Sequence, residues 1–241
     1  MGTSPVPGNT VSEYTPLHTH RYERKFVVDT LTSHQVVSLV RLHPRLFYAP
    51  YPPRYVNNLY LDTADMEYYY DNVYGAASRR KVRVRWYGDL QSEIARPILE
   101  VKVKDGLVGT KRSYPMPGFS VAPDFSSSTV QRLFGGASLP YAVACEVRCL
   151  SVVLLNRYHR CYYASRDGAF RLTIDTDVTY YRANGALGNR LLHRQAGYRE
   201  VIVELKYAVD QETAANRVVG YFPFRVTRNS KYVQGVERVY F

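Results

Sequence analysis

The chain has 241 residues, 46% of them hydrophobic and 22% charged, which is typical of a globular protein with room for one large or two small domains. No apolar run approaches the roughly 18 residues of a membrane-spanning helix, and no secretory pattern opens the chain, so we expect a cytoplasmic location. The net charge of +11 favours a polyanionic partner: nucleic acid, anionic lipid or phosphates.

The N-terminal third predicts a leader followed by alternating elements. Residues 1–17 are rich in Pro, Gly, Ser and Thr without periodicity, which predicts a flexible leader before a single domain over residues 18–241. Alternation then predicts a strand over 21–28. Thr32 or Ser33 can cap a helix that Pro44 stops. Another strand is predicted over 55–62, and a short helix over 65–73.

The most regular pattern lies in RKVRVRWY over residues 80–87 and LEVKVK over residues 99–104. Because strand side chains point alternately to opposite faces, each stretch has one apolar and one charged face. The charged faces carry Lys81, Arg83 and Arg85 in the first stretch and Glu100, Lys102 and Lys104 in the second. Two such strands side by side predict a basic surface, although an ordinary hairpin with its charged face in water gives the same pattern.

The rest of the chain continues in the same manner. A hairpin turn is expected at Asp105-Gly106, with a return strand over 110–116 and a second hairpin turn at Asp167-Gly168. Helices are predicted over 126–134 and 211–220, and strands over 144–151, 152–165, 171–178 and 199–207. The tail over 225–241 carries basic residues among aromatic ones. Three cysteines, an odd number at spacings that match no zinc pattern, are expected to be free thiols.

At least four strands therefore separate apolar from mostly basic residues, and two architectures meet that pattern. A sandwich would turn its charged faces outward, whereas a closed barrel would enclose them and cover its apolar outer face with helices. The scarcity of Asp on the charged faces favours a binding site. The chain lacks GxxxxGK[ST] and GxGxxG, and no Ser-His-Asp or Cys-His order stands out. Phosphates would thus be bound by side chains on strands.

Eight short stretches, in chain order, carry a resemblance to a known family. They are YERKF from Tyr22, YLDT from Tyr60, KVRVRWYG from Lys81, LEVK from Leu99, YHR from Tyr158, IDTD from Ile174, VELK from Val203, and SKYV from Ser230 with Gly235. Together they resemble the VTC domain, the polyphosphate polymerase domain of the vacuolar transporter chaperone complex. That domain belongs to the triphosphate tunnel metalloenzymes, or CYTH-like superfamily.

The resemblance implies an α+β fold, an antiparallel eight-stranded β-barrel with helices packed on its outside. Its basic interior would bind a triphosphate or polyphosphate together with Mn²⁺ or Mg²⁺. Carried over by position, the catalytic residues would be Arg83, Arg85, Lys102 and Glu204, with Glu204 also the metal ligand. The substrate-binding residues would be Lys25, Lys111, Arg160, Arg228 and Lys231. The superfamily's opening ExExK appears as Arg21-x-Glu23-x-Lys25, which counts against a site for two metal ions.

The implied activity is metal-dependent transfer of the γ-phosphoryl group of ATP to a growing polyphosphate chain. A polyphosphate end is already an anion, whereas a triphosphatase must activate water, and no isolated carboxylate or histidine in the sequence clearly does so. A triphosphatase of the same fold is the first alternative. The second is a non-catalytic module that binds polyphosphate or nucleic acid, in which some of the 23 tyrosines would stack on bases.

Expected partners are ATP or another triphosphate and inorganic polyphosphate, with nucleic acid less favoured. A membrane protein that recruits the chain to a membrane is left open as a further partner. Asp62 and Asp175 are expected to cap turns or to pair with arginines rather than to act in catalysis.

Overall fold

The structure, a computed structural model, describes residues 21–106, 108–121, 126–183, 194–196 and 200–241. The predicted leader over residues 1–17 lies outside this part of the chain. No helix within the described ranges combines the length and the apolar character needed to cross a membrane.

Eleven strands and six α-helices make up the described chain. The strands are β1 (Arg21–Val28), β2 (Arg54–Asp62), β3 (Ser78–Tyr87), β4 (Glu93–Ile94), β5 (Ile98–Asp105), β6 (Val108–Pro115), β7 (Phe119–Ser120), β8 (Ser151–Ala164), β9 (Phe170–Arg182), β10 (Arg194–Ala196) and β11 (Val201–Ala208). The helices are α1 (Ser33–Arg41), α2 (Glu67–Tyr74), α3 (Ser127–Gly135), α4 (Tyr141–Arg148), α6 (Glu212–Gly220) and α7 (Lys231–Tyr240), with a 3-10 turn η1 (Val209–Gln211) before α6.

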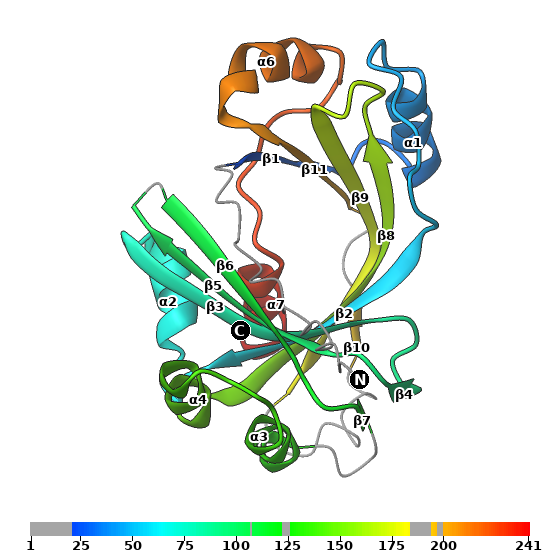
Figure 1. The fold of residues 1–241 in the computed structure, drawn as a ribbon. Coiled ribbons are helices and arrows are strands. Elements are labelled where there is room, and N and C mark those ends of the chain that lie inside the picture. Colours follow the sequence, from blue (N-terminus) through cyan, green and yellow to red (C-terminus); the bar gives the residue numbers. More distant parts are fainter. Residues whose placement is uncertain (1–20, 107, 122–125, 184–193, 197–199) are drawn as a thin grey trace, which may run out of the picture.

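Eight antiparallel strands form one curled sheet in the order β1-β11-β9-β8-β2-β3-β5-β6, and β10 adds to β9. The sheet bends around a central space (Figure 1). This confirms the predicted α+β fold with its eight-stranded sheet, but the barrel is open because no ladder joins β6 to β1 in the described chain. The free edge of β1 is instead occupied by Thr227, whose backbone N–H donates to the Lys25 carbonyl at 2.7 Å.

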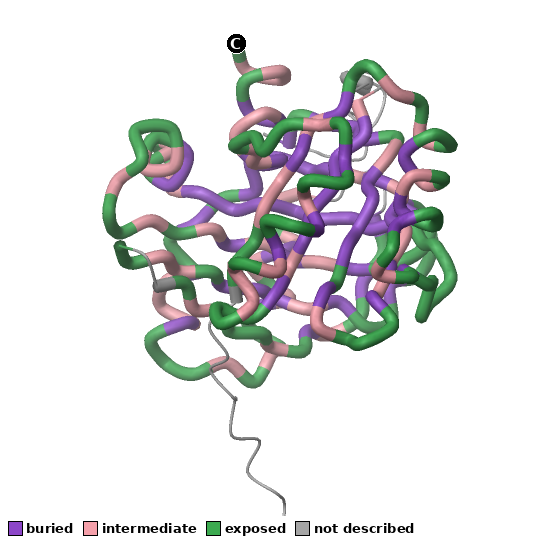
Figure 2. Tube along the Cα trace, turned by 90° about the horizontal axis from the view of Figure 1, so that it is seen from above, coloured by how far each residue is buried: buried purple, intermediate pink, exposed green. Residues whose placement is uncertain are grey.

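The outer, apolar face of the sheet is covered by helices in two separate clusters. Helices α3 and α4 cover β3 and β5 through residues such as Val130 and Val147, while α1 and α6 cover β1, β9 and β11 through residues such as Val36 and Val218. Buried residues run along the strands, and exposed residues follow the outer turns (Figure 2). The alternating apolar side chains therefore face the outer helices, and the alternating charged side chains face the concave side of the sheet.

Helix α7 departs from the prediction that helices pack on the outside of the barrel. It lies against the inner side of the sheet, where Tyr232 and Val236 pack with Leu154 and Tyr180 of β8 and β9 (Figure 1). Gly235 permits this approach, because a Cβ atom there would lie 2.5 Å from side-chain carbons of both Leu154 and Tyr180. The C-terminal helix therefore fills one part of the concave interior and leaves the rest open.

One strand assignment was wrong. Residues 144–151, predicted as strand, belong mostly to helix α4, which starts after Pro140. Val143 and Val147 lie one helical turn apart and both face the core, a spacing of four that the β-branched residues obscured in the sequence. The helix predicted from Thr32 is confirmed, since Thr32 and Gln35 form a reciprocal capping box at the start of α1.

Candidate functional site

A cavity of about 360 Å³ opens on the inner side of the curled sheet. Its lining contains nine lysines and arginines but only three glutamates. The lining residues are Glu23, Lys25, Tyr60, Lys81, Arg83, Arg85, Glu100, Lys102, Lys111, Tyr158, Arg160, Glu204, Lys206, Ser230, Lys231 and Tyr232. Such an excess of positive charge in one concave place suits a polyanion.

Strands β3, β5 and β6 supply one wall of this cavity through the two-residue period of their side chains. Directly paired residues point to the same face, so Lys81 lies opposite Lys102, and Lys102 lies opposite Lys111. One level along the strands, Arg83 lies opposite Glu100. The pairing thus brings together a row of three lysines with no acidic residue in it.

Glu100 is the acidic centre of this wall. It accepts hydrogen bonds from Arg83 Nε at 2.7 Å and from Lys111 Nζ at 2.8 Å, and Arg85 Nη1 lies 3.5 Å away. Burial alone would raise the pKa of Glu100, but Arg83 and Arg85 outweigh it and hold that pKa below its usual range. Glu100 is therefore an ionised anchor for three cations and not a proton acceptor at neutral pH.

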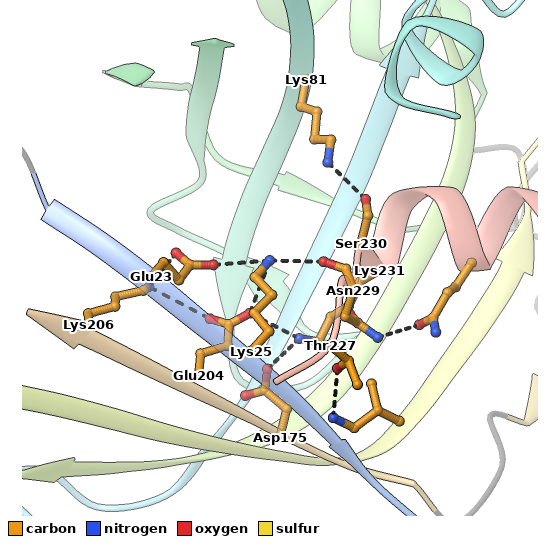
Figure 3. Close-up of polar contacts among 12 residues, drawn as sticks. Glu23, Lys25, Lys81, Asp175, Glu204, Lys206, Thr227, Asn229, Ser230 and Lys231 are labelled. Atoms are coloured by element: carbon orange, nitrogen blue, oxygen red, sulfur yellow. Dashed lines mark hydrogen bonds and ion pairs between the residues drawn. The ribbon is translucent and has the colours of Figure 1, made fainter. Parts of the chain in front are cut away.

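Strands β1, β8, β9 and β11 and helix α7 supply the opposite wall, called the paired wall here because its cations and carboxylates are closely paired. Arg160 donates two hydrogen bonds to Asp175, from Nε at 2.6 Å and from Nη2 at 2.7 Å. Lys231 Nζ lies 2.6 Å from Asp175 and 3.5 Å from Glu204 (Figure 3). Against the effect of burial, Lys231 and Arg160 keep the pKa of Glu204 well below its usual value. The expectation that Asp175 pairs with an arginine is confirmed.

Two glutamates of this paired wall share the same two lysines. Lys25 Nζ lies 3.0 Å from Glu23 and 3.8 Å from Glu204, and Lys206 Nζ lies 3.7 Å from each. Carboxylate oxygens suit Mn²⁺ or Mg²⁺, and Mg²⁺ is commonly bound by one or two carboxylates together with substrate phosphates. No group of three His, Cys, Asp or Glu side chains that could hold a metal ion gathers at this site or anywhere else in the described residues, so phosphate oxygens would have to complete the coordination. Glu204 and Glu23 therefore fit a metal ion that is completed by phosphate oxygens.

Lys81 and Lys102 differ from the other cations of the lining, because neither forms an ion pair with a carboxylate of the described chain. Lys81 Nζ donates to Ser230 Oγ at 2.8 Å (Figure 3). Burial, together with Lys25 and Lys102 close by, lowers the pKa of Lys81 to about 7. Burial also lowers the pKa of Lys102. Glu23 acts on Lys102 only from beyond ion-pair distance, so the charged form of both lysines would gain most from an arriving anion.

Of the nine residues predicted from the resemblance, eight line this one cavity: Lys25, Arg83, Arg85, Lys102, Lys111, Arg160, Glu204 and Lys231. Arg228 is exposed and is not among the lining residues, and its role with the substrate stays a prediction. Asp62 is buried and accepts hydrogen bonds from the backbone N–H groups of Tyr68 and Tyr69, so it caps α2 as expected.

Several lining residues were missing from the predicted site. Lys81 and Lys206 could have been found, since each lies two residues from a predicted site residue, Arg83 and Glu204, and therefore shares its face. Tyr158 could have been found in the same way, since it lies two residues from Arg160. Tyr60 carried no such signal, because it alternates with Leu59 and Leu61 in a strand where tyrosine is a common strand former.

The sequence and the structure were both compared with those of known proteins. The sequence matches the VTC domain over residues 20–240. A candidate adenylate cyclase from Vibrio parahaemolyticus has a similar structure, with a TM-score of 0.51 at 13% identity over 89% of this chain and 97% of that one. A candidate adenylyl cyclase from Hippeastrum, described as having a dominant triphosphatase activity, gives a TM-score of 0.52 at 14% identity over 89% and 94%. At such identities the structures show a shared fold only.

No curated protein matches the sequence. The family match covers nearly the whole chain and agrees with both the curled sheet and the basic interior. The chain therefore belongs to the VTC domain family and has the fold of the triphosphate tunnel proteins.

Proposed function

We propose that this protein is a metal-dependent polyphosphate polymerase, which transfers the γ-phosphoryl group of ATP to the end of a growing polyphosphate chain. The observation that carries the proposal is the concave lining of nine cations against three glutamates, and each of these glutamates is already ion-paired. Phosphoryl transfer needs charge neutralisation and in-line positioning more than covalent chemistry from the protein.

The unpaired charge of the lining offsets the repulsion between phosphates. A unit-charge pair 4 Å apart is worth about 4 kcal/mol at an effective dielectric constant of 20, so several cations together can hold a chain of phosphates. Arg83, Arg85 and Lys102 would hold the transferring phosphoryl group, because they lie side by side on β3 and β5. Lys231, at the start of α7, would guide the acceptor chain from the opposite wall.

Among the described residues no carboxylate or histidine of the lining is suited to act as a general base, which favours a polymerase over a triphosphatase. This leaves Lys81, with its pKa lowered to about 7, as the group that could activate water. Glu100 and Glu204 have lowered pKa values, each set against burial by its basic neighbours, and no histidine lines the cavity. Attack by water would need such a base, whereas a polyphosphate end attacks as an anion.

A divalent metal ion fits the same reaction. Glu204, with Glu23 beside it, would hold Mn²⁺ or Mg²⁺ together with phosphate oxygens. When bound, the ion would neutralise charge on the transferring group. Lys25 and Lys206, which contact both glutamates, would keep the two carboxylates ionised.

The test is an assay of the purified chain with ATP and either Mn²⁺ or Mg²⁺, read for both acid-labile polymer and orthophosphate. Polymer is the expected product. Arg83→Ala and Glu204→Gln should each abolish it, while circular dichroism shows that the fold persists. Arg112→Ala is the matched control, because Arg112 neighbours Lys111 on β6 but is absent from the cavity lining. Polymer formed at wild-type rates by Arg83→Ala would refute the assigned site.

Release of orthophosphate without polymer would make the protein a triphosphatase, the activity described for the Hippeastrum protein of the same fold. No turnover with either metal, combined with tight binding of polyphosphate or RNA, would make it a binding module. RNA binding would be sequence-tolerant and steeply salt-dependent, and Arg83→Ala should weaken it only in part.

A further inference from the structure

A cluster of aromatic rings around one arginine lies beside the phosphate cavity without being part of its lining. The guanidinium carbon of Arg54 lies 3.8 Å from the ring centre of Tyr87 and 5.0 Å from that of Tyr162. Arg54 Nε donates to the Tyr162 hydroxyl at 3.1 Å, and Tyr51 meets Tyr162 edge to face at 6.0 Å. No described carboxylate forms an ion pair with Arg54. We name these four residues the aromatic cluster.

Strand register places the aromatic cluster on the same inner face as the cavity. Arg54 of β2 pairs directly with Arg160 of β8, which lines the cavity. Tyr162 follows Arg160 by two residues, and Tyr87 follows the lining residue Arg85 by two. Two residues along a strand span about 6.8 Å, so the cluster continues the cavity wall just beyond Arg85 and Arg160.

Three of the four residues of the aromatic cluster are exposed to solvent, although Arg54 covers one face of the Tyr87 ring. Tyr87 is 42% exposed and Tyr51 is 61% exposed, and Arg54 is also exposed. Flat guanidinium and phenol groups with free faces are the groups on which proteins stack nucleobases, and such stacking accepts every base because each has a π face. A charged wall that binds phosphates and a stacking surface next to it match the two ends of a nucleotide.

We propose that the aromatic cluster is the base-binding site of a nucleoside triphosphate whose phosphates occupy the cavity. This proposal rests on the proposed function, which takes ATP as the phosphoryl donor and the cavity as the phosphate site, and it adds the place where the base of the nucleotide binds. Because stacking provides the contact, the site discriminates little among the four bases. A triphosphate without a base lacks this contact and binds more weakly.

The test compares equilibrium binding of inorganic triphosphate with that of a non-hydrolysable ATP analogue, by calorimetry and without turnover. The wild-type chain should bind the analogue roughly tenfold more tightly, within the range known for stacking of one base. Tyr87→Leu should remove this preference and leave triphosphate affinity unchanged, whereas Tyr87→Phe, which keeps the ring, should retain it. The GTP and CTP analogues should bind within a few-fold of the ATP analogue.

Tyr55→Leu is the matched control. Tyr55 is 37% exposed and also carries a stacked arginine, Arg157 at 3.9 Å, but it neighbours Arg54 in β2 and so points to the opposite face of the sheet. Its loss should leave the preference unchanged. Equal affinity of the wild type for both ligands, or an equal change in Tyr87→Leu and Tyr55→Leu, would overturn the proposal.

The same measurements separate this proposal from the proposed function. If both ligands bind with the expected preference but no polymer forms in the activity assay, the base site stands and the polymerase is refuted. If polymer forms from ATP while Tyr87→Leu leaves the preference intact, the polymerase stands and the base site is refuted. Failure of the wild type to bind inorganic triphosphate would refute both the base site and the polymerase.

Discussion

The two walls of the cavity carry similar numbers of cations but differ in how many of those cations are paired with carboxylates. On the paired wall, formed by β1, β8, β9, β11 and α7, each lining cation contacts a carboxylate: Lys25, Arg160, Lys206 and Lys231 share Glu23, Glu204 and the buried Asp175. The open wall is formed by β3, β5 and β6, and there Arg83, Arg85 and Lys111 all form ion pairs with Glu100. Among the described residues, Lys81 and Lys102 of this wall contact no carboxylate.

This difference assigns separate tasks to the two walls. Buried charges that are paired are costly to disturb, so the paired wall holds its side chains in place and ties α7 to the sheet. Charges that lack a partner gain most when an anion arrives, so the open wall contributes most to phosphate binding. Mutations should therefore lower stability on the paired wall and substrate affinity on the open one.

The largest expected effect is on the paired wall. Asp175→Ala should lower the free energy of unfolding by about 3–5 kcal/mol, because it leaves the buried Arg160 and Lys231 without their main partner. Urea denaturation measures this loss. Asp89→Ala is the control, since Asp89 is 83% exposed and its pair with Arg157 should contribute no more than about 1 kcal/mol. A similar small loss for both variants would contradict the division into two walls.

The next largest effect is on the open wall. Lys102→Met should weaken triphosphate binding by roughly 10- to 150-fold, the equivalent of about 1.5–3 kcal/mol for one charged hydrogen bond. Its stability should be unchanged or higher, because Lys102 lies between Lys81 and Lys111 in the ladder and like charges opposite each other are destabilising. Lys206→Met, on the paired wall, provides the comparison and should weaken binding less. Equal losses of affinity would show that pairing does not matter.

Triphosphate affinity should depend on pH through Lys81. Burial and the cations around this lysine lower its pKa to about 7. The charged groups facing it are Arg79 and Arg83 of β3, Lys25 of β1 and Lys102 of β5. A bound phosphate favours the protonated amine, so binding takes up a proton above pH 7. Triphosphate affinity should therefore fall by up to about tenfold per pH unit as the pH rises from 7 towards 10.

Calorimetry in buffers of different ionisation enthalpy measures this proton uptake directly. Lys81→Met should bind triphosphate more weakly at pH 7 but lose the additional slope above it. For stability the sign is opposite, because the unfolded chain binds more protons than the folded one between pH 7 and the usual lysine value, so this group's contribution to stability rises with pH there. An unchanged slope in the variant would exclude Lys81 as the titrating group.

The smallest effect is expected away from both walls. Thr32→Ala removes the capping box of α1, on the outer face of the sheet, and should cost about 1 kcal/mol of stability. Triphosphate affinity should not change, because α1 supplies no residue to the cavity lining. A loss of affinity in this variant would mean that general destabilisation, and not the charge of the open wall, governs binding.

The strands and their two faces could be predicted from the sequence, because side-chain direction in a strand repeats every two residues whatever the strand packs against. That period placed Arg83, Arg85 and Lys102 on charged faces, and turn residues such as Gly106, with φ of +56°, marked the hairpin. The family resemblance then predicted one common site for these and six further residues, of which all but Arg228 line the cavity. These inferences need only neighbours in the chain.

Tertiary structure decided which face became the inside. A sandwich and a tunnel share the same alternation, and only long-range pairing curled the sheet so that the charged face is concave. The same holds for Thr227 on the edge of β1, for α7 inside the sheet, and for the division of cations into paired and unpaired walls. Each depends on contacts between residues far apart in the sequence, and these form only once the whole chain has folded.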